Sequence, residues 1–380
     1  MRVLGLMSGT SADGVDGVLA SFAGPPRRPR WRIEAHHFSP YPTDLQRRLI
    51  ALGQGQPLSS AELVELAEAV TEEQARAARA CDPGGRASLV GCHGQTIWHR
   101  PPQQGRRGAS WQLLQGPLLA ELLGRPVVFD FRSADLALGG QGAPLVPPAD
   151  QALLGRCGGW RAVLNLGGIS NLTLIPPATG PERHHSVRGW DCGPANTLLD
   201  LATRHFSGGQ LAYDADGAWA RQGQSDENLI QLWLQEPYFQ APPPKSTGRE
   251  LFGQADLERR LAQLEGRPPA DALATLTAFS AAVVGQELGH GPQPVEMLVA
   301  GGGCRNGLLM GQLVERCRGL IVRPLAELGI AEAEREALAF ALLAWWHVRG
   351  HRGNAPAVTG ARKAAVLGLC ARPQASAWPM

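Results

Sequence analysis

An aspartate in a glycine- and proline-containing phrase is the strongest candidate for acid–base chemistry in this sequence. Asp191 begins the run Asp-Cys-Gly-Pro-Ala-Asn, directly before a predicted helix over 197–205. The run predicts a rigid turn that projects the carboxylate into a cleft, where it could accept a nucleophile's proton as a general base. The alternative is a helix-capping role, although Asn196 could supply that cap.

Two glycine-rich phrases, one in each half of the chain, could bind a polyphosphate. Residues 3–14 read Val-Leu-Gly-Leu-Met-Ser-Gly-Thr-Ser-Ala-Asp-Gly, and residues 163–171 read Val-Leu-Asn-Leu-Gly-Gly-Ile-Ser-Asn. Each phrase predicts a β-hairpin whose turn suits positive φ and close backbone approach to a ligand. Turn N–H groups and hydroxyls bind phosphate oxygens, and Asp13 or Asp16 could orient Mg²⁺ or its waters. Ordinary turns are the alternative for both phrases.

Three further polar phrases follow predicted strands. The run 301–303, Gly-Gly-Gly, could lie against an adenine or ribose, with a tight strand-to-helix turn as the alternative. His93 and Gln95 follow a strand in the first half, where a purely structural histidine is the alternative. Arg132 carries a planar guanidinium that suits a carboxylate.

Several nucleotide-binding and hydrolytic classes are excluded by residue usage. Lys245 and Lys363 are the two lysines, and neither follows a glycine, which excludes a Walker phosphate loop and argues against a protein kinase. Asn306 occupies the third-glycine place after 301–303 and argues against a Rossmann site. The sequence contains no G-x-S-x-G elbow and no H-E-x-x-H motif.

Composition indicates a two-domain cytoplasmic enzyme. A chain of 380 residues with 44% hydrophobic and 18% charged residues has the length and balance of two globular domains. A net charge of +2 gives no electrostatic case for nucleic acid or a membrane surface. Seven cysteines without a C-x-x-C pair indicate reduced thiols, with neither zinc site nor disulfide framework. The most apolar predicted helix, 337–348, is too short to cross a bilayer.

The predicted elements repeat their order in the two halves. The first half has the hairpin, a strand, a helix capped by Ser60, a strand, a helix and a strand, and the second half has a hairpin, two helices, a strand and a helix. This order predicts mixed α/β layers in two related lobes that face each other across a cleft. The predicted bounds are 3–22, 31–38, 61–80, 87–92, 113–123 and 126–131 for the first half, and 163–175, 197–205, 274–287 and 295–300 for the second.

These phrases together resemble the anhydro-N-acetylmuramic acid kinase family over nearly the whole chain. The matching segments are 9–16, 92–96, 130–132, 139–147, 165–171, 191–194, 244–250, 301–306 and 358–360. The resemblance implies two ribonuclease H-like (actin-like ATPase) lobes with mixed sheets flanked by helices and an active-site cleft between them. It implies a first lobe over 1–130, on which a segment of about 355–380 packs, and a second lobe over 131–354.

The resemblance also implies a reaction. The enzyme would open the 1,6-anhydro ring of 1,6-anhydro-N-acetylmuramic acid with water and phosphorylate O6, giving N-acetylmuramic acid 6-phosphate and ADP in cell-wall recycling. It would use ATP and Mg²⁺ and act as a cytoplasmic homodimer on a small amino sugar. The implied roles are Asp191 as catalytic base; Gly9, Thr10, Ser11, Ala12, Asp13, Gly14, Val15, Asp16, Gly167, Gly168, Asn171, Gly301, Gly302, Gly303 and Asn306 for ATP; and His93, Gln95, Arg132, Asp135 and Gln141 for the substrate.

The family pattern leaves one local departure and two alternative functions. Cys192 and Ala195 stand where the family commonly has Thr and Gly, and Cys192 would make the enzyme sensitive to oxidation. An ordinary sugar kinase would use Asp191 to deprotonate a hydroxyl and would consume no water. A chaperone-like ATP-driven binding module would need a separate substrate domain, for which the stretch after Gly303 is too short.

Overall fold

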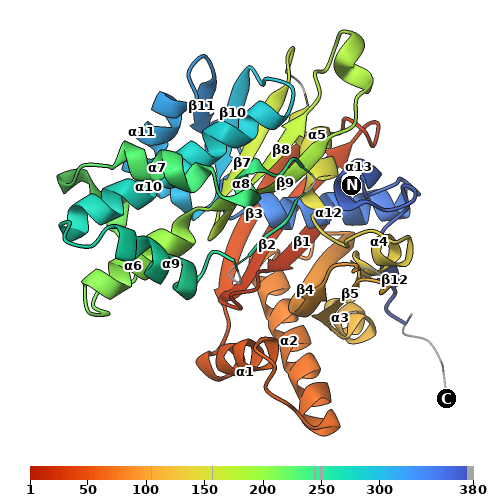
Figure 1. Ribbon diagram of the computed structural model, residues 1–380. Coiled ribbons are helices and arrows are strands. Elements are labelled where there is room, and N and C mark those ends of the chain that lie inside the picture. The colour runs from red at the N-terminus through yellow and green to blue at the C-terminus, as the bar shows by residue number, and fades with distance from the viewer. Residues whose placement is uncertain (104, 156, 244, 249–250, 375–380) are drawn as a thin grey trace, which may run out of the picture. The chain divides into compact units, whose positions relative to one another are not determined.

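The computed structural model describes residues 1–103, 105–155, 157–243, 245–248 and 251–374 (Figure 1). The chain forms two compact units. Unit 1 contains Met1–Leu154 and the chain from Ala333 onward, and unit 2 contains Gly155–Glu332. The sequence assigns 131–154 and 333–354 to the second lobe, whereas the structure places them in unit 1. The reason is that helix α12 (Arg335–Val348) packs on the sheet of unit 1 and on helix α5 (Val146–Leu154).

Unit 1 is built on a mixed sheet with the strand order β12-β6-β4-β1-β2-β3, and β5 pairs with β4. The first three strands form an antiparallel meander, while β4 is parallel to both β1 and β6. The strands are β1 Arg2–Ser8, β2 Gly14–Ala23, β3 Arg30–Pro40, β4 Leu89–Arg100, β5 Ala109–Leu113, β6 Val127–Phe129 and β12 Leu369–Ala371. The other helices are α1 Thr43–Gly53, α2 Ser60–Cys81, α3 Gly116–Leu123, α4 Ser133–Ala137 and α13 Pro356–Thr359.

Unit 2 repeats this arrangement with the order β11-β10-β7-β8-β9. Its antiparallel meander is β7 Arg161–Leu166, β8 Ile169–Ile175 and β9 Arg188–Pro194, and its parallel strands are β10 Glu296–Ala300 and β11 Ile321–Pro324. Its α-helices are α6 Asn196–Phe206, α7 Glu227–Leu234, α8 Pro237–Gln240, α9 Gln254–Gln263, α10 Pro269–Glu287 and α11 Gly307–Arg316. Six short 3₁₀ turns complete the described part: Pro181–His184, Ala215–Gly217, Ala220–Gln222, Leu288–His290, Gly302–Arg305 and Leu325–Leu328. The two mixed α/β sheets with one topology confirm the predicted duplicated fold class.

Helix α12 lies in direct backbone contact with the two central strands of unit 1. A Cβ atom on Gly5 would stand 1.9 Å from the Ala337 carbonyl oxygen, and one on Gly91 would stand 2.3 Å from the Phe340 carbonyl oxygen. Alternate residues of the same strands, among them Leu6, face the opposite side, where α2 covers the sheet. Only glycine therefore allows α12 to approach this closely.

Helix α2 begins one residue before its expected start. Ser59, not Ser60, is its N-cap, because the Ser59 hydroxyl accepts from the Glu62 N–H while the Glu62 carboxylate accepts from the Ser59 N–H at 2.8 Å. This capping box satisfies two backbone donors at once and therefore favours Ser59.

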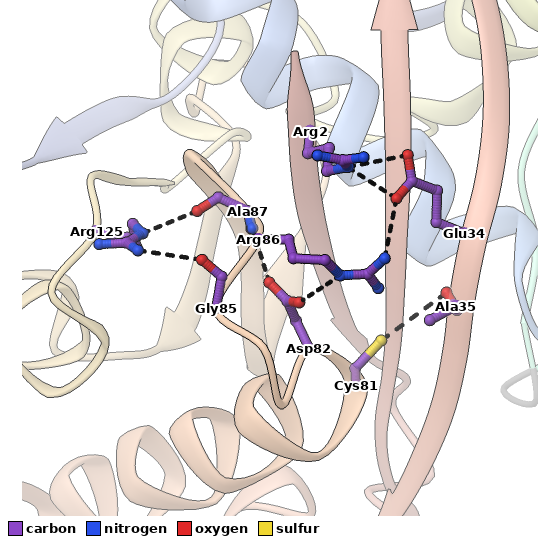
Figure 2. Close-up of polar contacts among 9 residues, drawn as sticks. All are labelled: Arg2, Glu34, Ala35, Cys81, Asp82, Gly85, Arg86, Ala87 and Arg125. Carbon is purple, nitrogen blue, oxygen red and sulfur yellow. Dashed lines mark hydrogen bonds and ion pairs between the residues drawn. The ribbon is translucent and has the colours of Figure 1, made fainter.

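A polar network fixes the sheet end opposite the first hairpin turn (Figure 2). Arg2 on β1 donates to the Glu34 carboxylate on β3 at 2.8 Å, and Arg86 joins Glu34 to Asp82, each at 3.3 Å. Arg125 donates to two carbonyls of the same loop. The network therefore holds the β1 start, the β3 strand and the connection from α2 to β4 in one place.

One described helical segment, Pro269–His290, passes the length and composition test for a membrane span. Of its most apolar window, 83% is buried inside the protein. This burial is that of a core helix, so the segment is weak evidence for a membrane span.

Replacing Gly91 by alanine should destabilise unit 1 by about 3 kcal/mol, because the added methyl meets helix backbone that cannot move alone. Gly53→Ala, whose methyl would meet nothing closer than 3.8 Å, is the matched control and should change stability little. Denaturant unfolding measures both; equal midpoints for the two variants would contradict the packing argument.

A buried carboxylate joins three parallel strands of unit 2. Glu296 accepts from Arg161 at 2.7 Å and from Arg323 at 2.7 Å. Desolvation opposes its ionisation, but the two guanidinium groups prevail and lower the pKa of Glu296. Its stabilising contribution is therefore complete above the pKa of the unfolded chain and is lost as pH falls through the lower, folded pKa.

Glu296→Gln should lower the free energy of unfolding at pH 7 by about 3 kcal/mol, because Arg161 loses its buried partner. The difference from wild type should shrink in acid as wild-type Glu296 becomes protonated. Glu327→Gln, which removes a half-exposed partner of Arg323 at 3.6 Å, is the control and should cost under about 1 kcal/mol. Unfolding curves across pH measure this; a pH-independent difference would contradict the assignment.

Candidate functional site

The aspartate singled out by the sequence lies within a strand. Asp191 is in the middle of β9, where its Cα is paired with that of Asn171 on β8, and not on a rigid turn before a helix. The predicted turn is wrong because β9 continues through Gly193 and Pro194. Gly193 has φ 153°, and a Cβ there would stand 2.7 Å from the Phe239 ring, so both backbone and space require glycine. Asp191 and Asn171, predicted for catalysis and ATP, are thus neighbours.

The Asp191 carboxylate is held by backbone. The Thr247 N–H donates to Asp191 Oδ2 at 3.0 Å, and the Asp191 N–H donates to the Lys245 carbonyl at 3.1 Å. The Tyr238 hydroxyl donates to the Asp191 carbonyl at 2.8 Å. A half-buried carboxylate with one oxygen fixed in this way is suited to proton transfer. The same segment contains Pro244, Arg249 and Glu250 of the resemblance, which lie outside the described residues.

The thiol beside this carboxylate is buried and its pKa is raised. Cys192 is buried, and desolvation, followed by the charges of Glu287 and Asp191, raises its pKa well above the ordinary value. The thiolate is the nucleophilic form, so the expected oxidation sensitivity at Cys192 finds no support.

The glycine turn of the unit 2 hairpin is fastened to the start of α6. The Gly168 carbonyl accepts from the Ala195 N–H at 2.9 Å and the Thr197 N–H at 3.1 Å, and the Asn196 amide donates to the Gly167 carbonyl at 2.8 Å. Neither turn glycine has positive φ, contrary to the sequence interpretation. Gly168 is required by space, since its Cβ would lie 2.6 Å from the Thr197 hydroxyl.

A cavity of about 410 Å³ lies beside this turn in unit 2, within the size range of small-molecule sites. Asn196, which holds the hairpin turn, also lines the cavity, so turn and cavity adjoin. Tyr213 offers an exposed ring and Arg305 a cation that also pairs with Glu332 at 3.0 Å. Of the three aspartates that line the cavity, Asp214 and Asp216 already accept from backbone N–H groups. The lining residues are Asn196, Leu199, Asp200, Tyr213, Asp214, Ala215, Asp216, Leu273, Thr277, Gly302, Arg305 and Asn306.

The three glycines after β10 have two different surroundings. Gly302 and Asn306 line the cavity, and the Asn306 side chain also accepts from the Leu309 N–H as the N-cap of α11. Gly301 and Gly303 pack on the end of β7, because Cβ atoms there would lie 2.8 Å and 2.6 Å from Leu166. The tight-turn alternative therefore describes Gly301 and Gly303, whereas Gly302 faces the cavity.

The first hairpin turn, in unit 1, exposes part of its phrase. Gly9, Thr10, Ser11 and Asp13 are exposed, and Asp13 Oδ1 accepts from the Gln46 amide at 3.0 Å. The positive φ of this turn, 52°, falls on Ala12 and on neither glycine.

The rest of the phrase is packed into the sheet. The side chains of Ala12 and Val15 are buried in the core, and a Cβ on Gly14 would stand 2.3 Å from the Ser39 carbonyl oxygen. Asp16 lies on β2, 3.1 Å from His36, and desolvation raises its pKa. Side-chain contact with a ligand is therefore restricted to the exposed part of the phrase.

Among the predicted substrate residues, a buried histidine holds an arginine. His93 Nε2 accepts from Arg132 at 2.9 Å, and His93 Nδ1 lies 2.9 Å from the Gly94 carbonyl, so Nδ1 carries the proton. Desolvation and the Arg132 charge lower the pKa of His93 to about 3, which keeps the ring neutral. Arg132 also donates to the Gly142 carbonyl at 2.8 Å. The guanidinium is therefore fixed and half-buried.

Two other predicted substrate residues are structural in this arrangement. Gln95 is buried, accepts from the Ser8 hydroxyl at 2.6 Å and donates to the Gly9 carbonyl at 3.0 Å, which holds the first hairpin. Asp135 is fully buried and accepts from the Gly142 N–H, Asn354 and Thr359. It thereby ties the loop around 139–142 to the C-terminal segment.

Gln141 belongs to the loop that Asp135 holds. Its side chain is half-buried, and its N–H donates to the Thr359 carbonyl at 2.8 Å. Arg132 and Gln141 are therefore the two predicted substrate residues that keep access to a ligand.

The sequence interpretation misses Glu336. This carboxylate stands in the first turn of α12. The residue is exposed to solvent, and the Asp16 and Asp150 carboxylates and the Arg335 and Arg132 guanidinium groups all act on its charge. The adjacent Arg335 is fastened to Asp150 by a buried pair at 2.5 Å. Periodicity assigns the apolar face of α12 to the core and gives no signal that this end faces charged groups.

Two mixed sheets of the same strand order, each with a glycine-rich hairpin, define the two-lobed actin-like fold class. The model of the anhydro-N-acetylmuramic acid kinase family matches residues 1–373. A protein of that name from Parasynechococcus marenigrum (strain WH8102) is 63% identical over 378 residues, covering 98% of this chain and 100% of the relative. Another from Prochlorococcus marinus (strain MIT 9211) is 53% identical over 379 residues with the same coverage. The chain belongs to the anhydro-N-acetylmuramic acid kinase family and is a kinase.

Solved structures show weaker similarity. Component A of (R)-2-hydroxyglutaryl-CoA dehydratase from Acidaminococcus fermentans has a TM-score of 0.40 at 14% identity, covering 91% of this chain and 98% of that one. A ROK family glucokinase from Streptomyces griseus, in complex with glucose and AMPPNP, has a TM-score of 0.39 at 12% identity, covering 91% and 99%.

Proposed function

We propose that this kinase couples hydrolytic opening of the ring of 1,6-anhydro-N-acetylmuramic acid to phosphorylation of O6. The observation that carries the proposal is the Asp191 carboxylate, fixed by the Thr247 N–H on the strand next to the glycine hairpin of unit 2. A general base in that position is what the attack of water requires. Family membership supports the choice of an anhydro sugar as substrate.

The proposed step moves one proton and exchanges two bonds. Asp191 takes a proton from water as the water oxygen attacks C1 of the sugar. The C1–O6 bond breaks, and O6 attacks the γ-phosphorus of ATP as the bond to the β–γ bridging oxygen breaks. The products are N-acetylmuramic acid 6-phosphate and ADP. The first half resembles glycoside hydrolysis, and the second half depends on positioning of the reacting groups.

ATP binding is assigned to both glycine hairpins and to the cavity of unit 2. The exposed turn of unit 1 and the partly exposed turn of unit 2 offer N–H groups and hydroxyls for phosphates. The adjoining cavity has room for a nucleoside, with Tyr213 for a base and aspartates for ribose hydroxyls.

Magnesium fits this arrangement only as a companion of the nucleotide. Among the residues that the structure describes, no group of three or more His, Cys, Asp or Glu side chains could hold a metal ion. Mg²⁺ bound to nucleotides takes one or two carboxylates besides phosphates and waters. Asp13 is exposed at the turn and fits this role, while Asp16 is engaged with His36. When bound, the ion would neutralise phosphate charge.

Arg132 is assigned to the lactyl carboxylate of the sugar. Its guanidinium is fixed by His93 and Gly142 and has the fork geometry that matches a carboxylate. Family membership also supports a role in recycling peptidoglycan and a homodimer in the cytoplasm.

Asp191→Asn should reduce turnover by about 10²–10⁴-fold, because the amide cannot take the proton of water. The assay follows ATP-dependent turnover of 1,6-anhydro-N-acetylmuramic acid in ¹⁸O-labelled water. Wild type should place label at C1 of a 6-phosphorylated product. Asp226→Asn is the matched control, because asparagine caps helix α7 as well as aspartate does, and it should keep activity.

Two outcomes would contradict the proposal. Unlabelled C1 in the wild-type product would show that water does not open the ring. No turnover of the anhydro sugar together with phosphorylation of a simple hexose would establish an ordinary sugar kinase, with Asp191 acting on a hydroxyl.

Arg132→Gln should raise KM for the anhydro sugar by about 10- to 100-fold and leave KM for ATP unchanged, because a charge-assisted pair to the lactyl group is lost. The control substrate is 1,6-anhydro-N-acetylglucosamine, which has no lactyl group. Steady-state kinetics with both sugars measure the effect. An equal penalty on both would place Arg132 away from the carboxylate.

A further inference from the structure

A buried ion pair lies beside Asp191 in unit 2. Lys245 Nζ is 2.6 Å from Glu287 Oε1, and the two side chains are 7% and 0% exposed. The same ammonium donates to the Tyr238 carbonyl at 2.9 Å and lies 4.8 Å from the centre of the Tyr238 ring. The second carboxylate oxygen of Glu287 accepts from the Trp190 indole at 2.8 Å. With these partners, the ammonium is engaged inside the protein and not placed to meet a phosphate.

The Lys245–Glu287 pair holds the chain on both sides of Asp191 by hydrogen bonds. Trp190 precedes the aspartate and is bonded to Glu287. The Lys245 carbonyl accepts from the Asp191 N–H. Two residues later, the Thr247 N–H donates to the Asp191 carboxylate. Tyr238 adds a third connection, because its carbonyl accepts from Lys245 and its hydroxyl donates to the Asp191 carbonyl. Movement of the pair would therefore move the groups that orient the carboxylate.

Residue choice supports a specific role for the cation. The chain has 36 basic residues, of which two are lysine, so arginine is its usual cation. Lysine stands at the position where one compact ammonium must reach a carboxylate, a carbonyl and a ring face together. The Thr247 hydroxyl is buried and has no hydrogen-bond partner among the described residues.

We propose that Lys245 and Glu287 are positioning residues, which hold the 245–247 segment against β9 so that the Thr247 N–H fixes Asp191 for proton transfer. The inference rests on the proposed role of Asp191. Such a pair as a whole adds little net stability, because apolar residues often replace both partners without loss, whereas removing one partner leaves a buried charge and destabilises the protein. The use of the pair is to fix one geometry, and misplacement of a base by about 1 Å costs roughly 10²-fold in rate.

The test compares Lys245→Met, Glu287→Gln and the double variant. Each should lower kcat by about 10- to 100-fold with KM for ATP unchanged. Each should also move the acid limb of the kcat/KM profile to higher pH, because loss of the Thr247 N–H disfavours the ionised carboxylate. Among the residues that the structure describes, the titratable groups around Asp191 include Cys192, Tyr238, Lys245, Glu287 and, beside Glu287, His290.

The direction in which the acid limb of the pH profile moves distinguishes positioning from a direct effect of charge. If charge alone mattered, removing the cation would move the acid limb upward and removing the anion would move it downward. The double variant would then resemble wild type. Positioning predicts the same upward direction for all three, so opposite shifts would overturn the proposal.

Two controls separate positioning from stability. Glu296→Gln disrupts another buried pair of unit 2 and should lower the unfolding midpoint without moving the pH profile. Trp190→Phe keeps both charges and removes the indole donor together with part of the ring volume, so it should destabilise the protein less than the variants that leave a buried charge. It should lower kcat several-fold and move the acid limb upward. An unchanged kcat and pH profile in folded Trp190→Phe would overturn the proposal.

Failure of the underlying role of Asp191 is recognised separately. Full activity of Asp191→Asn would refute the base itself. If Asp191→Asn loses activity while folded Lys245→Met, Glu287→Gln and the double variant keep the wild-type kcat and pH profile, only the positioning role is refuted.

Discussion

The structure of unit 1 depends on backbone contact between α12 and strands β1 and β4. Gly5 and Gly91 leave the space into which the helix carbonyls fit, and a single methyl at either position would collide with them. The contact fixes more than packing. Strand β1 leads into the first glycine turn, β4 carries His93, and α12 presents Glu336 from its first turn. The first glycine turn, the histidine that holds Arg132, and Glu336 therefore share one rigid support.

Local signals in the sequence are sufficient for much of the fold. Alternating apolar residues and glycine turns predict both hairpins, and the repeated order predicts two mixed sheets, because these features depend on neighbours along the chain. The domain division is not local. Residues 131–154 join unit 1 because α12, much later in the chain, packs against α5 there. Strand β9 is missed for a similar reason, since its glycine and proline suggest a turn and only pairing with β8 keeps it extended.

The candidate site shows the same limit. Residue type selects Asp191 and Arg132 as candidates, because a carboxylate and a guanidinium in glycine-rich phrases offer base chemistry and carboxylate binding. Type does not separate ligand contact from support: Gln95 and Asp135 are polar and lie in the right phrases, yet both are buried and satisfied within the protein. Lys245 and Glu287 carry no motif that pairs them, since they meet only after folding. Glycine is also required for two different physical reasons, space and positive φ. At Gly168 the requirement is space and at Gly301 it includes positive φ, and composition cannot distinguish them.

The discontinuity of unit 1 sets an order of events on the ribosome. Unit 2 is one continuous segment, Gly155–Glu332, and can complete its core once that segment has emerged. The earlier residues Met1–Leu154 cannot do so, because the helix that covers Gly5 and Gly91 is synthesised only after the whole of unit 2. The sheet of unit 1 consequently waits with one apolar face uncovered while the following domain folds. The nascent first segment is therefore the part of this chain that most needs protection from aggregation during translation.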